Sequence, residues 1–144
     1  MEKTQVMVYF SLFADEFSLD AVTKQLDIVP TESYKKGDII KKISPTENHV
    51  RGYTRWKLST GYQESLDVGD QLNLIINQIG GKASIINDLK RRFGLECRFT
   101  IVIIMNNGYT PGLYLDESLI AFANSINADF DIDLYANPYD EIDE

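Results

Sequence analysis

Residues 95–105 read LECRFTIVIIM, and this stretch has the strongest strand pattern in the chain. Cys97, Phe99, Ile101 and Ile103 recur at every second position, so in a strand they share one face. The opposite face begins with charged residues and becomes apolar towards the end of the run. A strand that is apolar on both faces is buried on both faces. We therefore predict that these residues form a central strand of a sheet.

Three further segments are predicted as strands. Residues 5–13, QVMVYFSLF, are rich in β-branched and aromatic residues and indicate a buried strand. Residues 53–60 alternate in polarity and direct Trp56 and Leu58 towards the core. Alternation in the last strand predicts three inward residues, Phe130, Ile132 and Leu134, and three outward ones, Asp129, Asp131 and Asp133.

Helical periodicity and capping residues predict helices between these strands. Ser18 is placed to cap one short helix, and Asp116 is placed to cap another. Between them, apolar residues recur at helical spacing over residues 68–93, with an interruption at Gly80 and Gly81. This segment is either one broken helix or two helices in tandem.

The order of these elements predicts an α+β fold. Two units of strand, capped helix and strand can be drawn, over residues 5–60 and 95–135. They suggest a mainly antiparallel sheet with helices packed on one face, in a ferredoxin-like duplicated split βαβ plan with an additional broken helix. A length of 144 residues suits one domain, which we expect to span residues 1–135, followed by an acidic C-terminal tail at 136–144.

Charge is unevenly distributed along the chain, which has a net charge of -8. Residues 33–57 carry seven bases against two acids, whereas residues 116–144 carry nine acids and no base. Such segregation concerns partners and solubility more than fold. Residues 35–57 also interleave bases with aromatic rings, as surfaces that bind single-stranded nucleic acid do. The acidic end nevertheless disfavours nucleic acid as the main ligand, and we expect none.

Few residues are suited to catalysis. His49 is the only histidine and lies in a polar, turn-rich segment, residues 31–50, while Cys97, the only cysteine, lies on the apolar face of its strand. A Ser-His-Asp or Cys-His site would have to use this histidine, and a buried thiol is shielded from attack. We therefore predict no catalytic residue and no cofactor, and we expect that the protein is not an enzyme.

The alternating aspartates Asp129, Asp131 and Asp133 allow three interpretations. Their oxygens could bind a hard cation such as calcium, but Leu134 occupies the position at which a calcium loop needs glycine, so we predict no metal site. Charges on the outward face of an edge strand also discourage edge-to-edge pairing. In the third interpretation these carboxylates bind a basic partner.

No stretch has the pattern of a secretory signal or a membrane span. The first apolar run, residues 6–13, is shorter than either requires. A single cysteine cannot form an intrachain disulfide, which favours a reducing compartment. We expect a cytoplasmic protein that does not bind membranes.

Three stretches resemble the bacterial family described as domain of unknown function 4279. They are residues 17–38, FSLDAVTKQLDIVPTESYKKGD, residues 55–60, RWKLST, and residues 131–135, DIDLY. The resemblance spans nearly the whole chain and implies a small bacterial cytoplasmic protein, but it supplies no catalytic residues and leaves the activity open. Because many small acidic bacterial proteins of this size are immunity proteins, which neutralise a toxin by binding it, the resemblance favours that role.

Together these observations favour a binding function. We expect a protein partner, a basic toxin being one candidate, to bind an acidic and aromatic C-terminal face. The expected contact residues are Asp129, Asp131, Asp133, Tyr135, Tyr139, Asp140, Glu141, Asp143 and Glu144. Tyrosine suits such a face because it offers a large contact area at a small cost in rotamer entropy. The alternative is a small-molecule-sensing or regulatory domain that uses the loop at residues 31–50.

Overall fold

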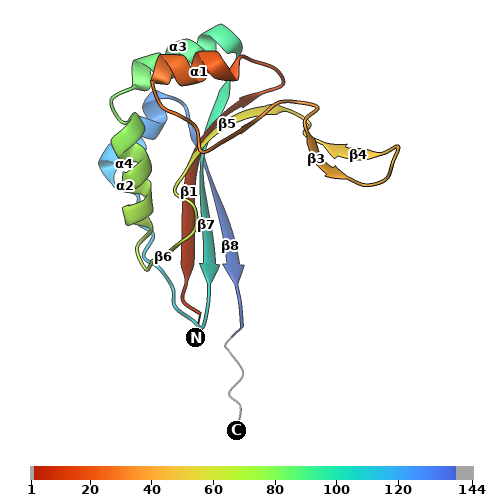
Figure 1. Cartoon of the computed structure of the whole chain (residues 1–144). Helices are drawn as coiled ribbons and strands as arrows, with labels where there is room; N and C mark the ends of the chain where they lie inside the picture. Colours follow the sequence, from red (N-terminus) through yellow and green to blue (C-terminus); the bar gives the residue numbers. More distant parts are fainter. Residues whose placement is uncertain (1, 139–144) are drawn as a thin grey trace.

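The computed structural model describes residues 2–138 and has its helices gathered on one side of a sheet (Figure 1). The strands are β1 (Gln5–Ala14), β2 (Glu32–Tyr34), β3 (Ile39–Lys42), β4 (Asn48–Val50), β5 (Thr54–Ser59), β6 (Gln63–Glu64), β7 (Glu96–Met105) and β8 (Asp129–Ala136). The helices are α1 (Leu19–Leu26), α2 (Val68–Ile79), α3 (Ala83–Phe93) and α4 (Glu117–Ser125). None of these helices is long and apolar enough to cross a membrane.

The main sheet has the strand order β2-β5-β1-β7-β8, with β6 pairing to β1. All of its neighbours are antiparallel except β7 and β8, which run parallel. The α+β class and the mainly antiparallel sheet predicted from the sequence are therefore confirmed. The prediction of an inner strand at residues 95–105 is also confirmed, because β7 pairs on both sides. The order is compatible with the ferredoxin-like plan, which stays a prediction.

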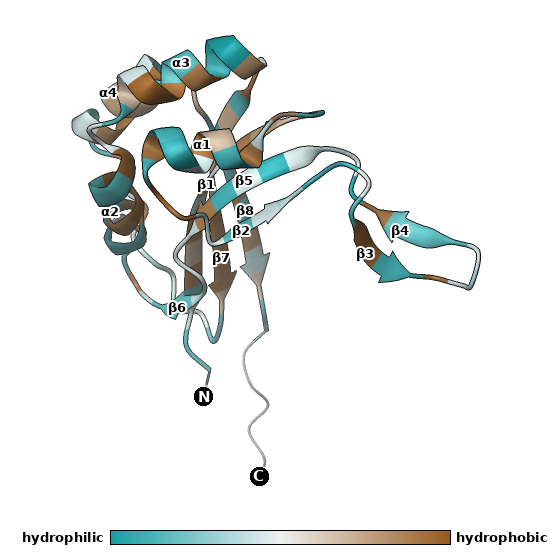
Figure 2. Cartoon of the chain, turned by 45° about the horizontal axis from the view of Figure 1, so that its top comes forward, coloured by the Kyte–Doolittle hydropathy of each residue, from teal (hydrophilic) through white to brown (hydrophobic). Residues whose placement is uncertain are grey.

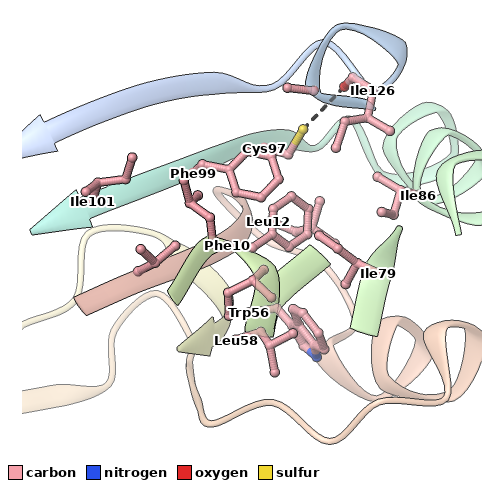
Figure 3. Close-up of a cluster of buried hydrophobic side chains, with 14 of the residues drawn as sticks. Phe10, Leu12, Trp56, Leu58, Ile79, Ile86, Cys97, Phe99, Ile101 and Ile126 are labelled. Atoms are coloured by element: carbon pink, nitrogen blue, oxygen red, sulfur yellow. Dashed lines mark hydrogen bonds between the residues drawn. The ribbon is translucent and has the colours of Figure 1, made fainter. Parts of the chain in front are cut away.

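The core lies between the helices and one face of the sheet (Figure 3). Phe10 of β1, Trp56 of β5 and Phe99 of β7 are fully buried there, and Ile79 of α2 and Ile86 of α3 meet them from the helix layer. Burial of apolar surface on this scale is the main force that holds the helices on the sheet. The helices therefore pack on one face, as the sequence predicts.

Local sequence explains where the helices begin and where they break. The side chain of Ser18 accepts a hydrogen bond from the backbone N–H of Ala21, which caps α1, and Asp116 caps α4 through the N–H of Leu119. The segment at residues 68–93 forms two helices that separate at Gly80. A Cβ atom on Gly80 would lie 2.7 Å from the carbonyl oxygen of Ile76, so no larger residue fits this junction.

Residues 31–50 differ from the turn-rich loop that the sequence predicts. They contain the short strand β2 and a separate two-stranded hairpin, β3 and β4, which projects away from the main sheet (Figures 1 and 2). Ile39 and Val50 pair across this hairpin and remain 65% and 44% exposed. The strands escaped prediction because each has only three or four residues and no buried face to impose alternation.

The prediction that Phe130, Ile132 and Leu134 all point into the core is wrong for two of them. Phe130 stacks on Phe99, with 5.2 Å between ring centroids, but Ile132 and Leu134 are 38% and 60% exposed. Both side chains do lie on the helix side of the sheet, as alternation predicts. Because β8 is the edge strand, however, the helix layer covers only its beginning.

Candidate functional site

The side of the sheet that points away from the helices is the candidate site, and we call it the uncovered face. Side chains of a strand alternate between the two sides, so in β1 the buried core residues alternate with Met7, Tyr9, Ser11 and Phe13. Strand pairing places residues of β5 and β7 on either side of this row. The uncovered face therefore combines side chains that are far apart in the chain.

Four aromatic rings and four cations gather on the uncovered face near β5. We call them the basic-aromatic cluster: Tyr9, Phe13, Tyr34, Tyr53, Arg51, Arg55, Lys57 and Arg98. They come together because β5 and β7 both pair with β1, and β2 pairs with β5. Sequence reasoning noted the part of this set within residues 34–57 but not the contributions of β1 and β7.

Phe13 contacts two guanidinium groups in this cluster. The Cζ atoms of Arg55 and Arg98 are 4.9 and 5.1 Å from the centroid of its ring, and Arg55 is also 5.1 Å from the ring centroid of Tyr53. At such distances the ring attracts the positive charge. Arg98 has a carboxylate 4.0 Å away, that of Asp129, whereas Arg55 forms no ion pair with any described residue.

The other two cations share one carboxylate. Arg51 and Lys57 lie 3.7 and 3.6 Å from the oxygens of Glu32. Each also lies over a ring: the Cζ of Arg51 is 3.9 Å from the centroid of Tyr34, and the Nζ of Lys57 is 4.0 Å from that of Tyr9. One acid between two bases leaves this end of the uncovered face positive.

Tyr34 in this cluster stays neutral near neutral pH, because its pKa is raised. Burial raises the pKa of Tyr34 to about 12, and its hydrogen bond to Tyr53 acts in the same direction, while the charge of Arg55 opposes both. The hydroxyl of Tyr34 donates this bond, with 3.2 Å between the two oxygens. Tyr34 therefore contributes no negative charge to the cluster near neutral pH.

The structure brings four of the predicted partner-binding residues together on β8. Asp129, Asp131, Asp133 and Tyr135 project to the uncovered face, beside the outward residues of β7 that begin with Arg98. We call the three aspartates the acidic row. The other five predicted contact residues lie outside the described part of the chain: Tyr139, Asp140, Glu141, Asp143 and Glu144. Partner binding by all nine stays a prediction.

The uncovered face is thus electrically polarised across the sheet. The basic-aromatic cluster lies towards β2 and β5, and the acidic row lies on β8 at the opposite edge. Within residues 2–138, one ion pair joins the two ends, between Arg98 and Asp129. The periodicity of β1 could have predicted the positions of Tyr9 and Phe13 on the uncovered face, since they alternate with the apolar core residues of the strand.

The residues with the most reactive side chains lie away from this face. Cys97 is buried on the helix side, where its thiol donates a hydrogen bond to the carbonyl oxygen of Ile126, 3.3 Å away (Figure 3). Burial raises the pKa of this thiol, although the nearby Lys90 lowers it. The predicted core role of Cys97 is confirmed. His49 is exposed on β4, and no group of three possible metal ligands occurs among the described residues.

An open depression of about 390 Å³ lies on the uncovered face between β1 and β5. Met7, Thr31, Glu32 and Lys57 contribute to its lining. Two of these residues belong to the start of the 31–50 segment. The hairpin at the end of that segment projects away from the sheet (Figure 2), and none of its residues lines the depression.

The fold and the site define an α+β protein with a one-sided helix layer and a charged, aromatic sheet face. The chain belongs to the family described as domain of unknown function (DUF4279), whose model matches residues 4–137. The resemblance seen in the sequence is therefore confirmed. No curated protein and no solved structure matches the chain.

Proposed function

We propose that this protein acts by binding another protein through the uncovered face of its sheet. The observation that carries the proposal is the polarity of that face, with cations and rings at one edge and the acidic row at the other. A partner with the opposite arrangement of charge would be oriented as it approaches and held in one register. The rings provide the contact area that supports affinity.

Polarity also favours a protein over a nucleic acid as the partner. A phosphate backbone carries one sign of charge along its whole length. It would be attracted to the basic-aromatic cluster but repelled by Asp131 and Asp133, which have no basic neighbour opposite them on β7. The net charge of -8 opposes a polyanion at longer range.

Within this class, we propose an immunity protein of the bacterial cytoplasm that neutralises a basic toxin. The acidic row favours a partner with a positively charged surface. The chain's net charge of -8 would also speed its association with such a partner. We also propose that the chain is not an enzyme, since its only histidine is exposed on the projecting hairpin and its only cysteine is buried.

The depression beside Lys57 supports a second candidate, a small-molecule-sensing or regulatory domain. Its lining offers a cation, a carboxylate and a hydroxyl from Thr31 in one place. A metabolite that raises the melting temperature, in cells from which no protein partner can be recovered, would favour this candidate over the protein-binding one.

The decisive experiment is recovery of a partner from the source cell with the wild-type protein and a charge-reversed one. We expect Asp131→Lys combined with Asp133→Lys to abolish recovery, because the acidic row would then repel a basic surface. The matched control is Asp88→Lys combined with Glu117→Lys, which makes the same change in net charge on exposed helix positions.

Circular dichroism would establish that both double variants are folded. Recovery by the wild type and the control, but not by the acidic-row variant, supports the proposal. Equal recovery by all three proteins would show that the acidic row does not bind the partner.

A further inference from the structure

Two of the three buried side-chain polar atoms that lack a hydrogen-bond partner among the described residues lie on the uncovered face. They are the Oγ of Ser11 and the Nε of Arg55, on the neighbouring strands β1 and β5. Buried polar groups are nearly always hydrogen-bonded in native proteins, because leaving one unpaired costs free energy. Two such atoms in one place indicate that something outside the chain completes their bonding.

Ser11 lies at the centre of the positive charge on this face. It is fully buried, and its direct cross-strand neighbours are Lys57 on β5 and Arg98 on β7. Tyr9 and Phe13 flank it along β1, two residues away on the same side. The unpaired hydroxyl therefore lies between two cations and two aromatic rings.

Phe13 holds the guanidinium groups without using up their donors. Its ring centroid is 4.9 Å from the Cζ of Arg55 and 5.1 Å from that of Arg98, and a ring attracts the charge of a guanidinium but accepts few of its five N–H bonds. Arg98 keeps 34% of its side chain exposed. Arg55 is half-buried, so an anion can reach both side chains at their solvent-exposed ends.

Charge balance points to an anion as the missing partner. Arg55 forms no ion pair within the described residues, and Arg98 forms one, with Asp129, 4.0 Å away. Glu96, the cross-strand neighbour of Phe13, takes part in none of these ion pairs. Glu32 is already shared by two other cations. The four cations of the basic-aromatic cluster therefore outnumber the three carboxylates beside them, those of Glu32, Glu96 and Asp129.

We propose that Arg55, Arg98 and Ser11 form an oxyanion-binding site that takes a carboxylate side chain from the protein partner. A carboxylate fits because the planar guanidinium presents two parallel N–H donors at the spacing of its two oxygens. A phosphate shares this chemistry, but a chain of phosphates would meet the acidic row on the same face. That the carboxylate comes from a protein rests on the proposed protein-binding function. The presence of an oxyanion-binding site does not depend on that function.

The site can be tested without the partner, by nuclear magnetic resonance of the arginine Nε–Hε groups in the whole protein. Acetate, inorganic phosphate, a lysine-rich peptide that carries one glutamate, and an oligothymidylate would each be added at constant ionic strength. We expect saturable shifts of the Arg55 and Arg98 signals with acetate, and larger ones with the peptide. The signals of Arg91 and Arg92 on α3 are internal controls and should not shift.

Uniform shifts of all arginine signals, or none, would overturn the site. Tighter binding of the oligothymidylate than of the peptide would show that the site serves nucleic acid and would overturn the assignment of a protein carboxylate.

Two conservative variants separate recognition from folding. Arg55→Lys keeps the charge but removes the paired donors, and Ser11→Ala removes only the hydroxyl. We expect each to bind the peptide about tenfold more weakly, the effect of losing one charge-assisted hydrogen bond. Arg91→Lys is the matched control and should bind as the wild type does. Unchanged binding by both Arg55→Lys and Ser11→Ala would contradict the proposal.

Failure of this site and failure of the proposed function have different signatures. If the arginine signals do not respond but the acidic-row variant still loses its partner, protein binding stands and the oxyanion site is wrong. If the signals respond and no partner is recovered, the site stands and the protein-binding proposal fails.

Discussion

At the scale of single residues, Trp56 shows how a polar atom is accommodated in the core. The indole is fully buried beneath α1, and its Nε1–H donates to the Oγ1 of Thr23, 3.0 Å away. A buried donor that is paired in this way contributes to stability, whereas an unpaired one is costly. The contact therefore fixes α1 against β5 as well as satisfying the indole.

Thr23→Val tests this contact, because valine keeps the shape of threonine but cannot accept the bond. We expect a loss of about 1–3 kcal/mol in the free energy of unfolding, measured with urea, since the N–H stays buried and unpaired. In the Trp56→Phe background the same substitution should cost much less, because no donor remains. Equal costs in the two backgrounds would mean that the hydrogen bond contributes nothing.

At the scale of elements, local sequence and tertiary contact each account for part of what is seen. Ser18 and Asp116 cap their helices as predicted, because a cap needs only the side chain and the backbone three residues on. The hairpin of β3 and β4 and the exposure of Leu134 were not predicted. Both depend on which other elements pack against a strand, and the residues of the strand alone do not indicate this.

The junction of α2 and α3 gives a matched pair of substitutions. Gly80→Ala should lower the free energy of unfolding by about 1–3 kcal/mol, because the new Cβ would lie 2.7 Å from the carbonyl oxygen of Ile76. Gly81→Ala meets nothing within 4 Å and should change stability by less than about 1 kcal/mol. Urea unfolding of both variants measures the difference, and a larger loss at Gly81 would show that the helices do not part as described.

At the scale of the whole molecule, the arrangement of charge matters more than its sum. The chain has a net charge of -8, yet one edge of its uncovered face is positive and the other is negative. A partner recognised by such a surface is selected for its pattern of charge and repelled when it docks in the wrong orientation.

Partner affinity should accordingly fall as sodium chloride rises. Between low and high salt we expect the association rate to drop by about tenfold or more, with a smaller change in the dissociation rate, because screening acts mainly on the approach. Surface plasmon resonance with the recovered partner measures both rates. An association rate that is independent of salt would contradict a role for polarity in recognition.

The sequence by itself determined the class of fold, the caps and break of the helices, and the core positions of Trp56 and Cys97. These follow from periodicity and from interactions within a few residues, which the order of the chain contains. Only the tertiary structure decided that Phe13, Arg55 and Arg98 meet around Ser11. They meet because β1 pairs with β5 and β7, and strand pairing brings together residues that no local pattern relates.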